Sequence, residues 1–320
     1  MTFPLKRTLE NMTLSLKMLD CLKQGKKKVS CEAQKKIASF VSSQLTENGA
    51  FMDKSGKADL YYTSFGLMLA SVLKLNVNTN LTEQWLDGQE NKLSDLVNYS
   101  AYIRSKMLCE LLKTGKLNFA MKQIFKAKQT LPAFTDYPNG DMYSPYSQFM
   151  LLSLREDLNI NTVNHKELLT SLSAYSVEKG GYSNMRGGKQ ATTNATVAVL
   201  DEQTARLWAG GIATTNATVA ALAIRGQLCG YQDNDDIRFL MLSQDESGGF
   251  CTCASASIPD LLSTATALFI LKCYGVTPRF DATDFINAHW LPSGGFGATL
   301  MDETSDVEYT FYGLLALGAI

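Results

Sequence analysis

Three features are scarce or missing in this 320-residue sequence, and each absence excludes a class of protein. Charge of one sign is not in excess, because 30 basic residues face 31 acidic ones, so no basic face for nucleic acid is predicted. No apolar run reaches the roughly 18 residues that a transmembrane segment needs, and the first residues contain no signal-peptide core. Strand-type alternation of Val, Thr and aromatic residues is scarce. We therefore expect a soluble and nearly all-helical protein.

The cysteines point to a reducing compartment. Their number, seven, is odd, and they are scattered along the chain, as reduced thiols in a cytoplasmic protein would be. Hydrophobic residues make up 45% of the sequence, which is ample for a core without disulfides. The predicted localisation is cytoplasmic.

A repeat organises the carboxyl-terminal part of the chain. Gly248-Gly249-Phe250 is followed ten residues later by Asp260 and an apolar run, and Gly294-Gly295-Phe296 is followed in the same way by Asp306. Phe250 and Phe296 are 46 residues apart, a period long enough for two helices and their turns.

Similar turns occur upstream at uneven intervals. Phe51, Phe134 and Tyr182 each end a Gly- or Pro-marked turn, and the intervals to the next mark are 83, 48 and 68 residues. The run ATTNATVA occurs at residues 191–198 and again, 22 residues later, at 213–220. Removing this duplication from the 68-residue interval leaves 46. The sequence thus predicts a 22-residue insertion at residues 191–212.

The 83-residue interval is close to two periods, so a degenerate unit is expected around Trp85 to Leu112. This gives six units, each with an amphipathic helix, a Gly-rich loop and a more apolar second helix. Before them, residues 5–23 have the spacing of an amphipathic helix that Gly25 is expected to stop, and residues 26–28 are interpreted as a solvated lysine linker.

The second helices are apolar nearly all round, as residues 261–271 and 311–320 illustrate. Such helices suit a position that is buried on both sides, whereas an open solenoid would leave one face in water. The predicted fold is an all-α toroid, an α6/α6 barrel, formed by a single domain over residues 1–320. Apolar helices lie inside and amphipathic helices outside.

The motifs resemble those of a known family. The spacing Gln244-x-x-x-Gly248-Gly249-Phe250 and the pattern Asp306-x-x-Tyr309-Thr310-x-Tyr312 are similar to the prenyltransferase and squalene-cyclase repeat. That repeat builds protein prenyltransferase β subunits and class II terpene cyclases. The resemblance is strong over residues 240–320, fair over 174–229 and 37–75, and faint elsewhere. It implies an α6/α6 toroid whose central cavity binds an isoprenoid.

The zinc site that the resemblance implies is incomplete. Protein prenyltransferases hold zinc with an Asp, a Cys two residues later, and a His in the last unit. The matching positions here are Asp260, Leu262 and Tyr309, so one ligand of three is present. Cys251 and Cys253 form a nearby pair without a third Cys or a His close in sequence. No metal and no cofactor are expected.

Two further motifs have alternative interpretations. Arg186 and Lys189 form an Arg-x-x-Lys pair in a Gly-rich loop, which is either an anion site or a solvated loop. The run at residues 233–236, DNDD, has the letters of the cyclase motif DxDD, but it precedes an outer helix, where acids serve as first-turn and cap residues.

Acids ahead of the inner helices are the other candidates. Asp59, Asp260 and Asp306 either cap these helices or act as acids at the cavity mouth, and one residue can do both. Together with Tyr309, Asp260 and Asp306 are the predicted catalytic residues.

Aromatic residues fall near the starts of the inner helices. They can line an isoprenoid pocket or stabilise a carbocation, although core packing explains most of them equally well. The substrate-binding candidates among them are Tyr61, Tyr62, Tyr143, Tyr146 and Tyr312.

Three functions stay open on the sequence. The chain is a diverged transferase or cyclase that acts on a prenyl diphosphate, a binding protein for an apolar small molecule, or a non-catalytic scaffold whose ring surface binds a protein partner. No nucleic-acid partner and no membrane-spanning segment are expected.

Overall fold

The computed structural model describes residues 12–90, 93, 95–115, 144–158, 164–177, 180–186, 213–230, 235–253 and 255–320. These residues form 12 helices and one pair of short antiparallel strands. Within them, no helix combines the length and the apolar character that crossing a membrane requires.

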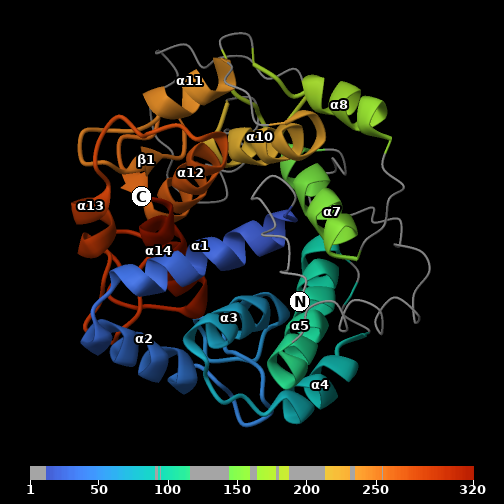
Figure 1. Cartoon of the computed structure of the whole chain (residues 1–320), viewed down its shortest axis with the longest axis vertical. Coiled ribbons are helices and arrows are strands. Elements are labelled where there is room, and N and C mark those ends of the chain that lie inside the picture. Colours follow the sequence, from blue (N-terminus) through green and yellow to red (C-terminus); the bar gives the residue numbers. More distant parts are fainter. Residues whose placement is uncertain are drawn as a thin grey trace, which may run out of the picture.

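Six helices form an inner ring (Figure 1). Each packs against the next one along the chain, and the last packs against the first, which closes the ring. They are α3 (Leu60–Leu73), α5 (Leu96–Thr114), α7 (Pro145–Asp157), α10 (Thr215–Cys229), α12 (Leu261–Tyr274) and α14 (Val307–Ala319). The predicted all-α toroid is confirmed.

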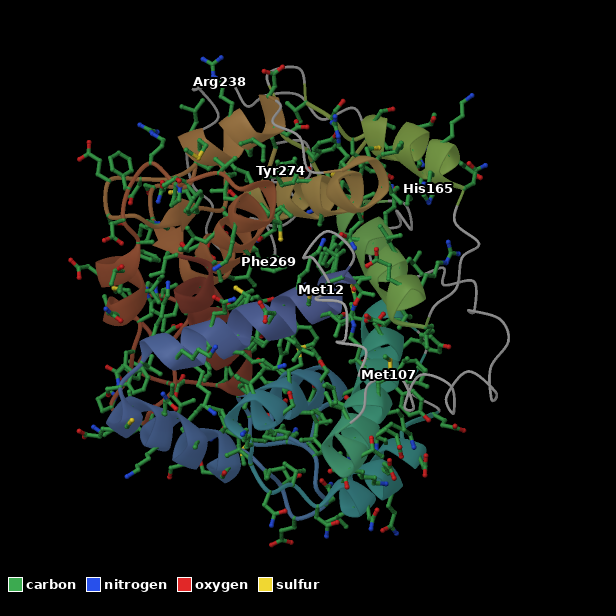
Figure 2. All side chains as sticks on the ribbon, viewed as in Figure 1. Met12, Met107, His165, Arg238, Phe269 and Tyr274 are labelled. Carbon is green, nitrogen blue, oxygen red and sulfur yellow. The ribbon has the colours of Figure 1, made fainter. Side chains whose placement is uncertain are left out.

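Outer helices precede five of the inner helices in the described chain. They are α2 (Cys31–Ser43), α4 (Thr79–Asp87), α8 (His165–Ser173), α11 (Asp235–Leu242) and α13 (Thr283–Ala288). Figure 2 shows His165 of α8 and Arg238 of α11 on the outer side of the ring, and Phe269 of α12 toward its interior.

Burial differs between the two layers as predicted. Helix α2 buries three of its 13 residues, whereas α12 buries nine of 14, because α12 is covered on both sides. The degenerate unit expected around Trp85 to Leu112 is the helix pair α4 and α5.

One local motif starts four of the inner helices. An Asp or Thr side chain caps the helix, and the Thr four residues later accepts a hydrogen bond from the backbone N–H of the aromatic residue in the preceding turn. The cap, Thr and aromatic residue are Asp59, Thr63 and Phe51; Thr214, Thr218 and Tyr182; Asp260, Thr264 and Phe250; Asp306, Thr310 and Phe296. The repeat in the sequence is therefore a repeat of this cap.

Two of the turn aromatics, Phe51 and Phe296, are buried against glycines of the inner helices. A Cβ atom on Gly66 would lie 2.2 Å from the Phe51 ring, and one on Gly313 would lie 2.5 Å from the Phe296 ring. In the unit of α12, the strands β1 (Phe250–Cys251) and β2 (Pro259–Asp260) pair Phe250 with Asp260. The turn and the cap are thus fixed to each other.

Helix α1 spans Leu14–Lys28, which corrects two predictions. Gly25 does not stop this helix: it lies inside it, and a Cβ atom there would lie 1.9 Å from the Leu314 carbonyl oxygen of α14. A Cβ atom on Gly318 of α14 would likewise lie 1.9 Å from the Cys21 carbonyl oxygen, so both glycines allow the two backbones to touch. Residues 26–28 are the last turn of α1 and not a linker. Residues 5–11 of the predicted helix lie outside the described chain.

Helix α1 covers the carboxyl-terminal ends of the inner helices (Figure 1). Cys21 Sγ donates to the Leu315 carbonyl of α14 at 3.3 Å, and Lys26 Nζ donates to the Val72 carbonyl of α3 at 3.0 Å. Ser15 Oγ donates to Asp157 at the end of α7 at 2.6 Å. The amino-terminal ends, where the capped turns gather, form the opposite end of the ring.

The second copy of the duplicated run begins helix α10. Thr214 of that copy is the cap, and Thr215 is the first helical residue. The first copy, residues 191–198, lies outside the described chain.

Candidate ligand site at the amino-terminal ends of the inner helices

The first and last inner helices meet at a hydrogen bond between two candidate groups. The Tyr61 hydroxyl of α3 donates to Glu308 Oε1 in the first turn of α14 at 2.8 Å. Tyr312 lies one turn further along α14, and burial together with the nearby Glu308 raises the pKa of its phenol. A polar chain of one phenol and one carboxyl therefore bridges the two helices.

Aromatic rings surround this chain. The Phe65 ring lies with its centroid 4.8 Å from that of Tyr61, 4.9 Å from that of Phe311 and 5.8 Å from that of Tyr312. The Tyr309 and Tyr312 centroids are 6.1 Å apart. We call Tyr61, Tyr62, Phe65, Tyr309, Phe311 and Tyr312 the aromatic cluster; its edge-to-face and tilted contacts are the arrangements that aromatic rings favour.

The cluster is enclosed but not fully covered. Burial raises the pKa of the Tyr61 and Tyr312 phenols well above the ordinary value, yet both side chains keep part of their surface accessible. Tyr62 is also half-buried. Its pKa is raised by this burial and by the nearby carboxyls of Asp306 and Glu308. The cluster thus offers accessible aromatic surface within the ring of inner helices.

Glu308 is the titratable group of the cluster. Burial raises the pKa of its carboxyl to about 7, and the nearby Asp306 contributes, while the Tyr61 hydrogen bond and Lys54 act in the opposite direction. The Glu308 carboxyl therefore keeps its proton to a higher pH than an ordinary glutamate does.

Asp306 joins the cluster from the cap of α14. One of its oxygens accepts the Tyr309 N–H at 2.8 Å, and the other lies 3.5 Å from Lys54 Nζ. Burial raises the pKa of Asp306, whereas the Tyr309 N–H and Lys54 act to lower it. Lys54 also lies over the Tyr309 ring, 5.1 Å from its centroid. The cap of α14 and one of the predicted catalytic acids are therefore the same residue.

Asp260 lies in the neighbouring unit and is occupied by structural contacts. It accepts the Ser263 N–H of α12 at 2.7 Å and the Thr252 hydroxyl at 2.6 Å. Leu262 follows it with an aliphatic side chain, and Tyr309 carries a phenol whose pKa is raised by burial and by the surrounding carboxyls.

These three residues do not fit the zinc site of protein prenyltransferases, because neither a Leu side chain nor a neutral phenol replaces thiolate or imidazole. Within the described ranges, no three His, Cys, Asp or Glu residues are placed to share a metal ion. Cys253 Sγ lies 3.2 Å from the Ser255 hydroxyl, and burial raises the pKa of the Cys251 thiol.

Arg186 lies apart from the aromatic cluster. Its Nε donates to the Tyr175 hydroxyl at 3.2 Å, and its side chain borders an open groove along α8 that Glu167 and Thr170 also line. Lys189 and Tyr143 lie outside the described residues. The predicted anion pair therefore stays a prediction.

The structure brings together most of the predicted tyrosines with one predicted acid. Tyr61, Tyr62, Tyr309, Tyr312 and Asp306 share the junction of α3 and α14. Tyr146 of α7 faces the same interior: burial raises its pKa, Arg104 lowers it, and Glu308 contributes. Residues 235 and 236 of the DNDD run lie in the first turn of the outer helix α11, where Asp236 accepts the Gly181 N–H at 3.0 Å and pairs with Arg225 at 3.1 Å; residues 233 and 234 lie outside the described chain, so their capping role stays a prediction.

Sequence reasoning missed Glu308 and Lys54. Glu308 carries a usable signal, because it is an acid in the first turn of a helix that is otherwise apolar. Lys54 carries none, since it belongs to the turn of the first unit and reaches Asp306 only when the ring closes.

The fold and the site define an α/α toroid with an aromatic interior. The family model of the prenyltransferase alpha-alpha toroid domain matches residues 11–213 and 121–320, which together span nearly the whole chain. The chain belongs to this family. No curated protein matches it.

Proposed function

We propose that the ring binds an isoprenoid or a similarly apolar chain against the aromatic cluster. The supporting observation is the accessible aromatic surface of α3 and α14 in an interior where burial raises the pKa of Tyr61 and Tyr312. Apolar pockets with a few placed polar groups are the usual sites for such ligands. The Tyr61–Glu308 pair supplies those polar groups.

The charges around the cluster favour a particular ligand end. Asp306 and Glu308 are acidic, and Lys54, already beside Asp306, is the cation that contacts the cluster in the described chain. A neutral hydroxyl or a carbon that becomes positive suits this environment better than a diphosphate. The diphosphate group of a prenyl diphosphate would bind cations outside the aromatic cluster, and we propose Arg186 and Lys189 for this role.

Two activities fit this site. One is a transferase or cyclase reaction on a prenyl diphosphate, in which Asp306 or Tyr309 faces the reacting carbon. The other is binding without catalysis, which the lost zinc ligands at Leu262 and Tyr309 favour.

Isothermal titration with farnesol and with farnesyl diphosphate tests the proposal. We expect both to bind the parent protein. The double variant Arg186→Ala, Lys189→Ala should bind farnesyl diphosphate roughly a hundredfold more weakly, because two charge-assisted contacts are lost. Its affinity for farnesol should be unchanged. Equal loss for both ligands would show a structural loop, and binding of neither by the parent would leave the scaffold function.

A second pair of variants locates the apolar chain. Phe65→Ala removes the ring that contacts Tyr61, Phe311 and Tyr312, so both ligands should bind about tenfold more weakly. Phe280→Ala is the control, because Phe280 precedes the outer helix α13 and contacts Arg279. Equal affinities in the two variants would place the ligand elsewhere.

A further inference from the structure

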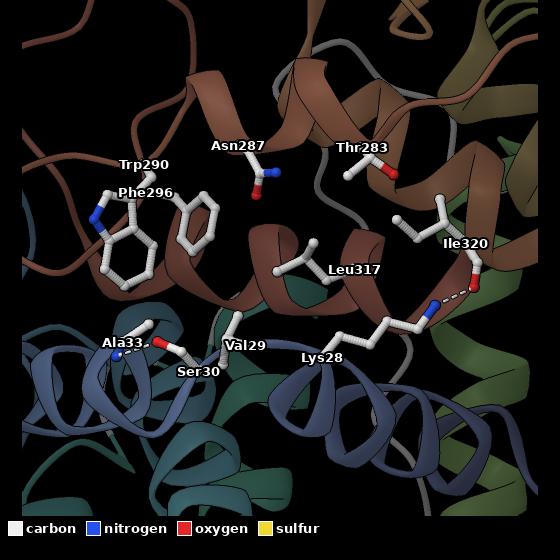
Figure 3. Close-up of a pocket in the computed structure, with 10 residues that line it drawn as sticks. All are labelled: Lys28, Val29, Ser30, Ala33, Thr283, Asn287, Trp290, Phe296, Leu317 and Ile320. Atoms are coloured by element: carbon white, nitrogen blue, oxygen red, sulfur yellow. Dashed lines mark hydrogen bonds between the residues drawn. The ribbon is translucent and has the colours of Figure 1, made fainter.

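A groove lies at the seam where the first unit meets the last. Val29, Trp290, Phe296 and Leu317 form its apolar lining, and Lys28 and Asn287 are among its polar groups (Figure 3). We call it the seam groove; its volume is about 510 Å³. One wall is the junction of α1 and α2, the other is α13, and α14 forms the floor.

The lining offers both an apolar seat and unused hydrogen-bonding groups. Val29 and Trp290 are the half-buried apolar residues of the seat, and the buried Phe296 supports Trp290 edge-to-face with ring centroids 5.2 Å apart. Neither the Asn287 amide nor the Trp290 indole N–H makes a hydrogen bond to any residue in the described ranges. In Figure 3 the Asn287 amide projects into the groove between Phe296 and Thr283. These groups are placed to bind a chain with polar backbone atoms.

Positive charge is concentrated on the wall of α1 and α2. Six lysines and one acid occur between Lys23 and Lys36. Lys28 stands at one end of this wall and donates to the Ile320 carbonyl, which uses one of its three N–H groups. At the other end, the Lys36 backbone contacts the turn at Gly294, and the exposed Lys36 ammonium pairs with Glu32 at 3.2 Å, which uses one of its three N–H groups. The α13 wall instead carries the exposed acids Asp281 and Asp284.

We propose that the seam groove binds an acidic peptide segment of a partner protein, with one large apolar side chain seated on Trp290 and Val29. The acids of the segment face Lys28 and Lys36, and its backbone meets Asn287. This surface is separate from the aromatic cluster inside the ring, so the proposal does not depend on the proposed ligand.

The shape of the surface favours a peptide over a membrane. Membrane-surface binding needs apolar side chains that protrude into the lipid, whereas the apolar groups here lie in a hollow. The exposed large hydrophobic residues of the described chain are elsewhere: Met185, Leu242, Ile258, Leu300 and Met301. A concave apolar site flanked by lysines is complementary to a protruding side chain flanked by acids.

Selection from displayed random peptides of about twelve residues, long enough to cross the groove, tests the proposal. We expect the intact protein to enrich acidic peptides that contain a Leu, Phe or Trp. Ala33→Trp, which fills the groove from α2, should abolish their binding. Asn287→Trp fills the groove from α13 and should abolish binding in the same way. If one of the two variants does not fold, the other one still tests the proposal. No enrichment, enrichment of neutral or basic peptides, or binding that survives filling would overturn the proposal.

Charge variants provide the second arm. The double variant Lys28→Gln, Lys36→Gln should bind a selected peptide about tenfold more weakly at low salt, and this loss of affinity should shrink as the salt concentration rises. The matched control is Lys57→Gln with Lys166→Gln, two exposed lysines away from the seam. Equal loss in the control pair would contradict the proposal. Binding of phosphatidylserine vesicles by both the parent and the filled variants would also contradict the proposal, because the lysines would then bind a membrane surface.

Discussion

The Tyr61 hydroxyl donates a hydrogen bond to Glu308 at 2.8 Å across the junction of the first and last inner helices. The two residues are 247 positions apart in the sequence, so this contact exists only when the ring is closed. It places a titratable carboxyl among aromatic rings, where its charge is costly. Ring closure and the chemistry of the candidate site are therefore coupled.

The raised pKa of Glu308 predicts a pH-dependent stability. Its folded-state pKa is about 7 against an ordinary 4.5, so the folded protein holds this proton more tightly than the unfolded chain does. The stability that the protonated group contributes is present below pH 4.5 and is lost as the pH rises toward 7. The slope is at most about 1.4 kcal/mol per pH unit.

Urea unfolding of the parent and of Glu308→Gln across this range measures the effect. The difference in unfolding free energy should fall between pH 4.5 and about 7 and then level off. Other buried carboxyls, such as Asp157, are shared by both proteins and cancel in the difference. Glu303→Gln, in the exposed preceding loop, is the control. Parallel curves for the parent and Glu308→Gln would contradict the assigned pKa.

Gly318→Ala should destabilise the protein by about 3 kcal/mol, because the new Cβ would lie 1.9 Å from the Cys21 carbonyl oxygen and force α1 away from α14. Gly88→Ala is the matched control: its Cβ would lie 3.4 Å from the nearest atom, and the residue has a helical φ of −74°. Thermal unfolding compares them. Similar melting temperatures would mean that α1 packs less closely than described.

Asp260→Ala should lower the free energy of unfolding by about 1 kcal/mol, because the Ser263 N–H loses its cap. Asp260→Asn should unfold with a free energy within a few tenths of a kcal/mol of the parent value. Chemical unfolding gives both values. The Asn variant also separates the two predicted roles. A capping residue leaves ligand binding and any turnover unchanged in Asp260→Asn, whereas a catalytic acid loses turnover without losing stability.

We expect no stoichiometric zinc in the purified protein, because Leu262 and Tyr309 replace two of the three ligands. Elemental analysis after purification without chelators measures this. Leu262→Cys with Tyr309→His restores the ligand types beside Asp260 and should gain zinc if the positions correspond. One tightly held zinc in the parent would show that the correspondence is wrong.

Deletion of residues 191–212 should leave a folded protein, because the second copy of the duplicated run already supplies the cap and first turn of α10. Circular dichroism and thermal unfolding measure helix content and cooperativity. An insoluble variant, or one that unfolds without a cooperative transition, would mean that the first copy is part of the ring.

The family fold was predictable because its signals are local. The cap at Asp306, the Thr four residues later and the preceding Gly-Gly-Phe turn interact within about one repeat, so their spacing is visible in the sequence. Apolar content all round a helix likewise reports burial on both sides, which is why residues 261–271 could be placed inside the ring.

Where a local signal had two meanings, the sequence interpretation was wrong. Gly25 has the residue type of a helix stop, yet it serves a backbone contact with α14 that lies almost 300 residues away. The lysines that follow it looked like a linker because charge runs are usually solvated, but the helix continues through them to Lys28.

The sequence by itself determined the helical hairpins, their caps, their inner and outer order and the family. Each of these depends on residues within one repeat of each other. Only the tertiary structure decided that Glu308 meets Tyr61, that Lys54 reaches Asp306, and that Lys28 and Trp290 border one groove. These pairs join the two ends of the chain, and ring closure by packing of apolar helices brings them together without any periodic pattern that marks them.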